Sequence, residues 1–174
     1  MLKPKKQKKI SHKQLVIAAR NWLTRKCSIV ITELAAGAGE EPDAIGWESH
    51  RSTLVECKIS RSDFLADQKK YFRALIPGIG LQRYFLTPPD LLKPEELPEG
   101  WGLIELHGRQ IKPIKTSIIF PHRNHQHEFS LLLSCLRRIG QKAPKGVSIK
   151  AYTYETKNRA TLSTEKEQTE DFTI

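Results

Sequence analysis

The sequence has few of the features that mark secreted, membrane or zinc-binding proteins. Only three cysteines occur in 174 residues and none forms a CxxC pair. This scarcity argues against a disulfide framework and indicates reduced core thiols in a cytoplasmic protein. No apolar run approaches the length of a membrane span, and polar residues interrupt the apolar stretch near the N-terminus, so neither a membrane segment nor a signal peptide is expected. The length suits one domain with a core of its own.

Acidic residues are absent from the first part of the chain. Residues 1–26 hold nine Lys or Arg and no Asp or Glu, whereas the remaining 148 residues hold 20 basic and 19 acidic side chains. Of the net charge of +10, +9 therefore resides in this N-terminal basic segment and +1 in the rest of the chain. We expect a basic arm over 1–10, a folded domain over 11–154 and a polar tail over 155–174. The arm suits phosphate neutralisation, or else a solvated tail that aids solubility; its candidate DNA contacts are Lys5, Lys6, Lys8 and Lys9.

Hydrophobic periodicity predicts an α/β fold. Ser11 and Ser60 are positioned to cap the first and second helices, and Pro113 confines the strand 110–115 to an edge of the sheet. The apolar stripe of the last helix is expected to face the core rather than a partner; its residues are Phe129, Leu132, Leu133, Leu136 and Ile139. The strand and helix signals alternate in a way that favours a small mixed β-sheet of about four to six strands flanked by helices. The predicted helices cover about 12–26, 63–75 and 128–139, and the predicted strands cover 28–34, 43–47, 53–59, 82–87, 101–106, 110–115 and 147–154.

A carboxylate and an ammonium stand out within the apolar run 53–59. A strand alternates its faces with period two, so Glu56 and Lys58 point one way while the apolar residues point the other. Asp43 begins a second strand-like run, and pairing of the two runs would bring Asp43 next to Glu56. Two convergent carboxylates suit a hard divalent cation that seeks oxygen ligands. The plain alternative is a surface ion pair between Glu56 and Lys58, worth about 0–1 kcal/mol.

This pattern resembles the PD-(D/E)xK nuclease superfamily, with Pro42-Asp43 as the first half and Glu56-x-Lys58 as the second. The resemblance covers roughly residues 12–115, and within the superfamily it is to the MmcB-like DNA-repair branch and to similar phage-type nucleases. The further stretches that carry it are Ile31-Thr32-Glu33, the segment 60–69, Arg83-Tyr84-Phe85-Leu86-Thr87-Pro88 and the segment 97–104.

The resemblance implies a restriction-endonuclease-like core and a set of site residues. Asp43 and Glu56 would bind Mg²⁺, for which Mn²⁺ can substitute, and the backbone carbonyl of Cys57 would be a further ligand. Lys58 would orient or deprotonate the attacking water. Glu33 matches an acidic position of the branch, although Glu41 can replace it.

The chain departs from the superfamily in one respect, because residues 11–26 contain no carboxylate to match the acid that many members carry in the first helix. In the helix after the motif, Lys69 and Lys70 would contact DNA, unless they belong to an ordinary polar helix face.

The sequence thus predicts a Mg²⁺-dependent endodeoxyribonuclease in DNA repair or processing, with Asp43, Glu56, Lys58 and Glu33 as its catalytic residues. The alternative is a catalytically silent nucleic-acid-binding or adaptor protein with the same fold. DNA is the expected partner. The oligomeric state stays open, with a homodimer among the possibilities.

Overall fold

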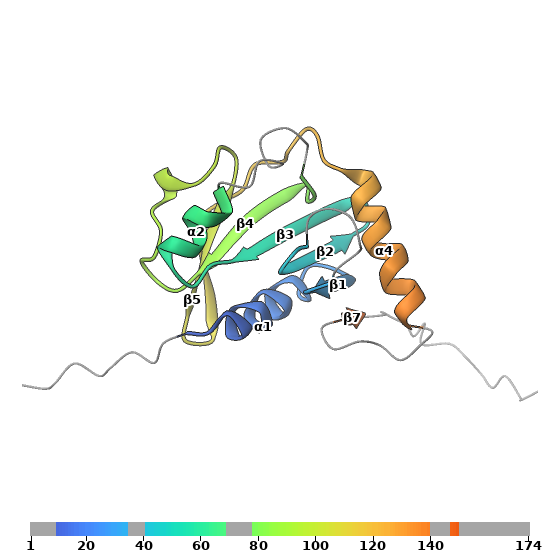
Figure 1. The fold of residues 1–174 in the computed structure, drawn as a ribbon, viewed down its shortest axis with the longest axis horizontal. Coiled ribbons are helices and arrows are strands. Elements are labelled where there is room, and N and C mark those ends of the chain that lie inside the picture. The colour runs from blue at the N-terminus through green and yellow to red at the C-terminus, as the bar shows by residue number, and fades with distance from the viewer. Residues whose placement is uncertain (1–9, 35–40, 69–77, 140–146, 150–174) are drawn as a thin grey trace, which may run out of the picture.

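The computed structural model describes residues 10–34, 41–68, 78–139 and 147–149. These residues form a mixed sheet with helices on both faces (Figure 1), as the α/β prediction required. The predicted tail over 155–174 and most of the basic arm lie outside the described residues. No helix among the described ranges has the length and apolar character needed to cross a bilayer.

The sheet has seven strands in the order β6-β5-β4-β3-β2-β1-β7. The first three strands are antiparallel neighbours, β3, β4 and β5 are parallel, and both edge strands are antiparallel to their neighbours. The seventh strand takes the sheet just beyond the predicted four to six. The strands are β1 (Ile29–Thr32), β2 (Ala44–Glu48), β3 (Arg51–Cys57), β4 (Gln82–Thr87), β5 (Gly102–His107), β6 (Gln110–Lys115) and β7 (Val147–Ile149).

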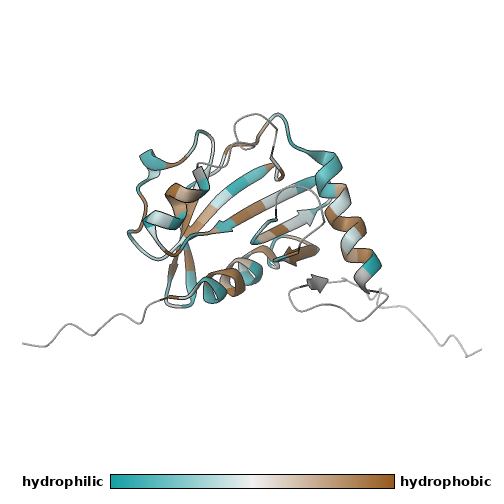
Figure 2. Cartoon of the chain, viewed as in Figure 1, coloured by the Kyte–Doolittle hydropathy of each residue, from teal (hydrophilic) through white to brown (hydrophobic). Residues whose placement is uncertain are grey.

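One face of the sheet is covered by α1 (His12–Leu23). The helix begins where predicted, because the side chain of Ser11 accepts a hydrogen bond from the backbone N–H of Gln14 and the Gln14 side chain reciprocates. Its buried residues recur at helical spacing and pack against alternate residues of the central strands. Figure 2 shows hydrophobic bands alternating with hydrophilic ones along this helix. We call this the α1 face; its fully or nearly buried members include Leu15, Ala19, Leu23, Val55, Cys57, Leu86 and Ile104.

The opposite face carries α2 (Arg61–Gln68), the short 3-10 helix η1 (Pro94–Glu96) and α4 (His125–Ile139). Its apolar cluster joins strand residues to Phe64 of α2 and to Leu131 and Cys135 of α4. Phe85 lies at its centre, stacked on Trp101 with ring centroids 4.5 Å apart and edge-on to Phe64 at 5.2 Å. We call this the α2 face.

The prediction that the apolar stripe of the last helix faces the core is wrong. Phe129, Leu133 and Leu136 are exposed, and the helix instead turns Leu131 and Cys135 inward, with Leu132 partly buried. The reason lies in the first turn, where Glu128 is buried and bonded to the sheet and so fixes the rotation of the helix. Apolar residues occur on more than one side of α4, so periodicity alone could not decide which side faces the core.

Candidate active site

The pairing of β2 with β3 places the two residues that carry the predicted carboxylates opposite each other. Ala44 pairs with Val55, so Asp43, one residue earlier, stands opposite Glu56, one residue later. Asp43 is fixed there by a hydrogen bond, since the backbone N–H of Cys57 donates to Asp43 Oδ2 at 2.7 Å. The register predicted from the sequence is therefore confirmed at this end of the sheet.

Glu56 and Lys58 share a face, as their spacing predicted, but they are buried. Glu56 is 4% exposed and Lys58 is 6% exposed, with Lys58 Nζ 3.5 Å from Glu56 Oε2. The neighbouring Val55 and Cys57 point to the α1 face. The alternative of a surface ion pair is therefore wrong, since both side chains are buried. Burial of such a pair costs desolvation free energy, which an exposed pair does not lose.

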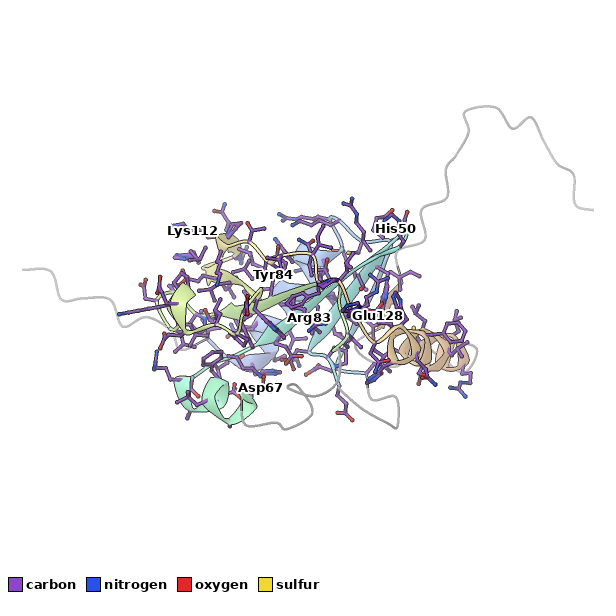
Figure 3. All side chains as sticks on the ribbon, turned by 90° about the horizontal axis from the view of Figure 1, so that it is seen from above. His50, Asp67, Arg83, Tyr84, Lys112 and Glu128 are labelled. Atoms are coloured by element: carbon purple, nitrogen blue, oxygen red, sulfur yellow. The ribbon has the colours of Figure 1, made fainter. Side chains whose placement is uncertain are left out.

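Asp67 of α2 is the residue that sequence reasoning missed. It is 3% exposed, and its Oδ1 lies 3.5 Å from Lys58 Nζ, so the ammonium contacts carboxylates from both the sheet and the helix. A signal was present, because Asp67 follows the buried Phe64 by three residues, one helical turn, and so faces the same way. Figure 3 shows Asp67 on the inner side of α2, toward the sheet.

Two contacts fix α2 over the end of β3. At its N-terminus, the backbone N–H of Asp63 donates to Ser60 Oγ at 3.1 Å, as the predicted cap required. On its outer side, Arg61 donates to both carboxylate oxygens of Glu96, one of them at 3.0 Å. The Arg61 hydrogen bond, aided by the backbone N–H of Lys93, lowers the pKa of Glu96 to about 2. The helix that carries Asp67 is thus anchored to the segment around η1.

The solvent-facing side of the site is formed by Asp43, Glu33 and His12. His12 Nε2, in the first turn of α1, lies 3.2 Å from Asp43 Oδ1, and the Asp43 side chain is 20% exposed. Glu33 is exposed just after β1, and its backbone N–H donates to the Asp43 carbonyl at 3.2 Å. Its φ of 49° is left-handed, which costs a non-glycine residue about 1–2 kcal/mol. Such strain is typical of functional sites. Glu41 is also exposed, two residues before Asp43.

The pKa of the buried Cys57 thiol is shifted by its burial and by the charged groups around the end of β3. Burial raises its pKa well above the ordinary value, and the carboxylates of Asp43, Glu56 and Glu33 raise it further, while Lys58 opposes them. All four predicted catalytic residues thus act electrostatically on one point at the end of β3. The thiol stays protonated, which makes the sulfur a poor metal ligand and leaves the backbone carbonyl as the group that Cys57 can offer.

The donors present suit a hard divalent cation in kind. Asp43, Glu56 and Asp67 supply three carboxylates against the one ammonium of Lys58 within the network of contacts above, and this excess of negative charge is largely buried. Mg²⁺ binds through one or two carboxylates and keeps several waters. In the part of the chain that the structure describes, no group of three or more His, Cys, Asp or Glu side chains is arranged to hold a metal ion. Asp43 and Glu56 are two carboxylate residues opposite each other across paired strands, and two is the number through which Mg²⁺ can bind.

The predicted DNA contacts lie outside the described residues. This holds for Lys5, Lys6, Lys8 and Lys9 of the basic arm and for Lys69 and Lys70 after α2. Their assignment stays a prediction from the sequence.

The comparisons with known proteins bear on the fold. No protein-family model matches the chain, and no curated protein is significantly similar to it. Among solved structures it is similar to the SPO1766 protein of unknown function from Silicibacter pomeroyi, with a TM-score of 0.57 and 16% sequence identity. The match covers 76% of this chain and 89% of that one. The fold described here is therefore shared with a solved protein.

Proposed function

We propose that this protein is a metal-dependent nuclease that hydrolyses DNA phosphodiester bonds, with a restriction-endonuclease-like core of the PD-(D/E)xK type. The observation that carries the proposal is the cross-strand placement of Asp43 opposite Glu56, with Lys58 in contact with Glu56. The fold alone does not require this arrangement, because burying the charged Glu56 and Lys58 costs free energy that apolar residues of the same volume would not.

Asp43 and Glu56 would hold Mg²⁺ or Mn²⁺, with the Cys57 carbonyl as a further ligand. The ion would supply charge neutralisation at the phosphate and a lowered pKa for a bound water. Asp43, with its partly exposed side chain, and the exposed Glu33 mark the side from which a substrate reaches the site. Glu33 would act as an outer carboxylate there.

Lys58 would orient the attacking water and offset phosphate charge through its three N–H donors. Its ammonium is held from two sides, by Glu56 and by Asp67, each 3.5 Å away. Because a shift of about 1 Å in a catalytic group can cost about 100-fold in rate, this double contact makes Asp67 a positioning residue for Lys58.

The test is DNA cleavage by the full chain. Plasmid, single-stranded and branched DNA are incubated with the protein and Mg²⁺ or Mn²⁺. We expect cleavage by the wild type, and a loss of about 10²–10⁴-fold in Asp43→Asn, Glu56→Gln and Lys58→Met, as for removal of a catalytic acid, base or charge. Glu33→Gln and Glu41→Gln, compared in the same assay, decide which of the two outer acids contributes.

The exposed Glu99→Gln is the matched control, since it removes one carboxylate far along the chain from the site. Undiminished cleavage by Asp43→Asn or Lys58→Met would remove these residues from the mechanism. A protein that binds DNA, shows no carboxylate-dependent Mg²⁺ affinity by calorimetry and cuts none of the substrates would be the silent binding protein instead.

The setting that we propose is DNA repair or processing in the cytoplasm. The sequence resemblance is to a repair branch, and the three cysteines are free and buried, which suits a reducing compartment.

A further inference from the structure

A groove separate from the site runs between the outer side of α1 and the hairpin of β5 and β6. It has a volume of about 390 Å³, within the range of about 300–1,000 Å³ that is usual for ligand sites. Its apolar lining includes Ile17 and Trp22 from the helix and Ile111 from β6. Ile17 is 41% exposed, a large apolar surface for a residue on a helix that already buries its other side.

The charged groups that line the groove are all cationic. Arg25 and Arg109 contribute from opposite sides, one from the end of α1 and one from the hairpin turn, and among the described residues no acidic side chain lines the groove. Lys26 Nζ lies 3.8 Å from the centre of the Trp22 ring, which adds a third cation beside the apolar lining. The amide side chains of Gln14 and Asn21 complete the polar part.

The groove and the candidate active site are joined through the first turn of α1. Ile10 lines the groove, and His12, two residues later, contacts Asp43. Figure 1 shows the start of α1 beside the lower end of the hairpin, and α1 contacts β6. The end of the groove at Ile10 is therefore two residues from His12, which contacts the partly exposed Asp43.

We propose that this groove binds a single strand of nucleic acid, with phosphates on Arg25 and Arg109 and bases against the apolar lining around Trp22. Single-stranded nucleic acid is recognised by this combination of cations along the backbone and aromatic or apolar contacts to bases. This proposal rests on the proposed function in two respects only: that the nucleic acid is DNA, and that the bound strand continues into the candidate active site. The carboxylates of an acidic peptide would pair with the two arginines, but they would make no contact of the stacking kind that bases make with Trp22 and the apolar lining.

Binding is measured with a labelled oligodeoxythymidine in the presence of a chelator, so that cleavage plays no part. Trp47 and Trp101 are buried at 8% and 7% exposure, so quenching of tryptophan fluorescence by the oligonucleotide should come from Trp22 and vanish in Trp22→Phe. Arg25→Ala and Arg109→Ala should each weaken binding roughly tenfold. Each should also reduce the slope of log K against log salt by about 0.7, the value for one phosphate contact on a single strand.

Arg51→Ala is the matched control, an exposed arginine at the start of β3 that lies outside the groove lining. Both groove arginines are exposed as well, so their loss should leave the thermal unfolding midpoint unchanged. Equal affinity and equal salt slope in Arg25→Ala, Arg109→Ala and Arg51→Ala would overturn the proposal. Stronger quenching by poly-glutamate than by the oligonucleotide would overturn it in favour of an acidic protein partner.

The same assay separates this proposal from the nuclease. Asp43→Asn should bind the oligonucleotide as the wild type does, because Asp43 is outside the groove lining. If no DNA is cut by any form of the protein while the groove variants still lose binding, the nuclease proposal fails and the groove stands. If DNA is cut but the groove variants bind normally, the reverse holds.

Discussion

The two faces of the sheet are built on different principles. The core cluster of the α1 face is apolar: α1 and alternate residues of the strands pack against each other without a buried charge in the cluster. The α2 face has an apolar cluster of similar size, yet every charged side chain that is buried within the described ranges adjoins it, namely Glu56, Lys58, Asp67, Glu105 and Glu128. The stability of the α1 face therefore depends on how well apolar side chains pack, whereas that of the α2 face depends also on hydrogen-bond and ion-pair partners for its buried charges.

Within the α2 face the buried charges fall into groups of different character. Glu128, on α4, accepts hydrogen bonds from Trp47 Nε1 at 3.1 Å, Ser52 Oγ at 2.8 Å and the backbone N–H of Gly80 at 2.8 Å. Glu56, at the other end of β3, is paired with the ammonium of Lys58. Figure 3 shows the two groups apart, with Asp67 on α2 and Glu128 beside α4. A carboxylate held by three directed donors serves the fold, whereas a cluster of opposed charges beside a partly exposed carboxylate suits chemistry.

Glu128→Ala should have the largest effect on stability. It leaves three buried donors and Arg123, 3.6 Å away, without their acceptor. Loss of one partner from such a network costs about 5 kcal/mol of the free energy of unfolding. Urea denaturation followed by circular dichroism measures it, with the exposed Glu99→Ala as control, expected within about 0.5 kcal/mol of wild type.

A cost for Glu128→Ala close to that of Glu99→Ala would contradict the structural role of Glu128. Cleavage, where the variant is folded, should persist, because Glu128 is at the far end of the sheet from the candidate site.

Lys58→Met should have the next largest effect, and its cost should depend on Asp67. The substitution removes the ammonium that the buried Glu56 and Asp67 carboxylates both contact, which we expect to cost about 3 kcal/mol. Adding Asp67→Asn removes one of the two like charges, so the double variant should be more stable than Lys58→Met alone by about 1 kcal/mol or more.

Chemical denaturation of the two single variants and the double variant forms a mutant cycle. Strict additivity of the three values would show that Asp67 and Lys58 do not interact, and would remove the positioning role given to Asp67. Asp67→Asn alone should lower the free energy of unfolding by less than Lys58→Met does, because Lys58 keeps its contact with Glu56.

The sequence predicted the sheet and half of the site because both follow from local patterns. Alternation along 53–59 fixes which side chains share a face, and the short connection from β2 to β3 fixes the register that sets Asp43 opposite Glu56. The capping residues Ser11 and Ser60 likewise marked where α1 and α2 begin. The proline in the last strand of the hairpin correctly placed β6 at an edge.

Features that depend on how elements meet could not be predicted in this way. The burial of Glu56 and Lys58 depends on tertiary packing, and Asp67 becomes a site residue only through the contact of α2 with Lys58. The rotation of α4 is decided by Glu128 reaching Trp47, a residue 81 positions away. The groove beside α1 likewise joins Arg25 to Arg109 across residues that no periodicity connects.

Gly46→Ala tests the α1 face and should have the smallest effect of the three. A methyl group at Gly46 would lie 2.7 Å from Cys27 Sγ and 2.9 Å from its Cβ, closer than packed atoms allow. Overpacking of this kind costs about 1–3 kcal/mol, or roughly 2–4 °C in the thermal midpoint per kcal/mol for a chain of this size. Because the contact is steric, Cys27→Ala in the same chain removes the sulfur and should recover part of the loss.

A double variant no more stable than Gly46→Ala would mean that the α1 face is not limited by shape at this point, and the contrast between the two faces would weaken. Neither substitution should change DNA cleavage, because both side chains lie on the face opposite Glu56 and Lys58.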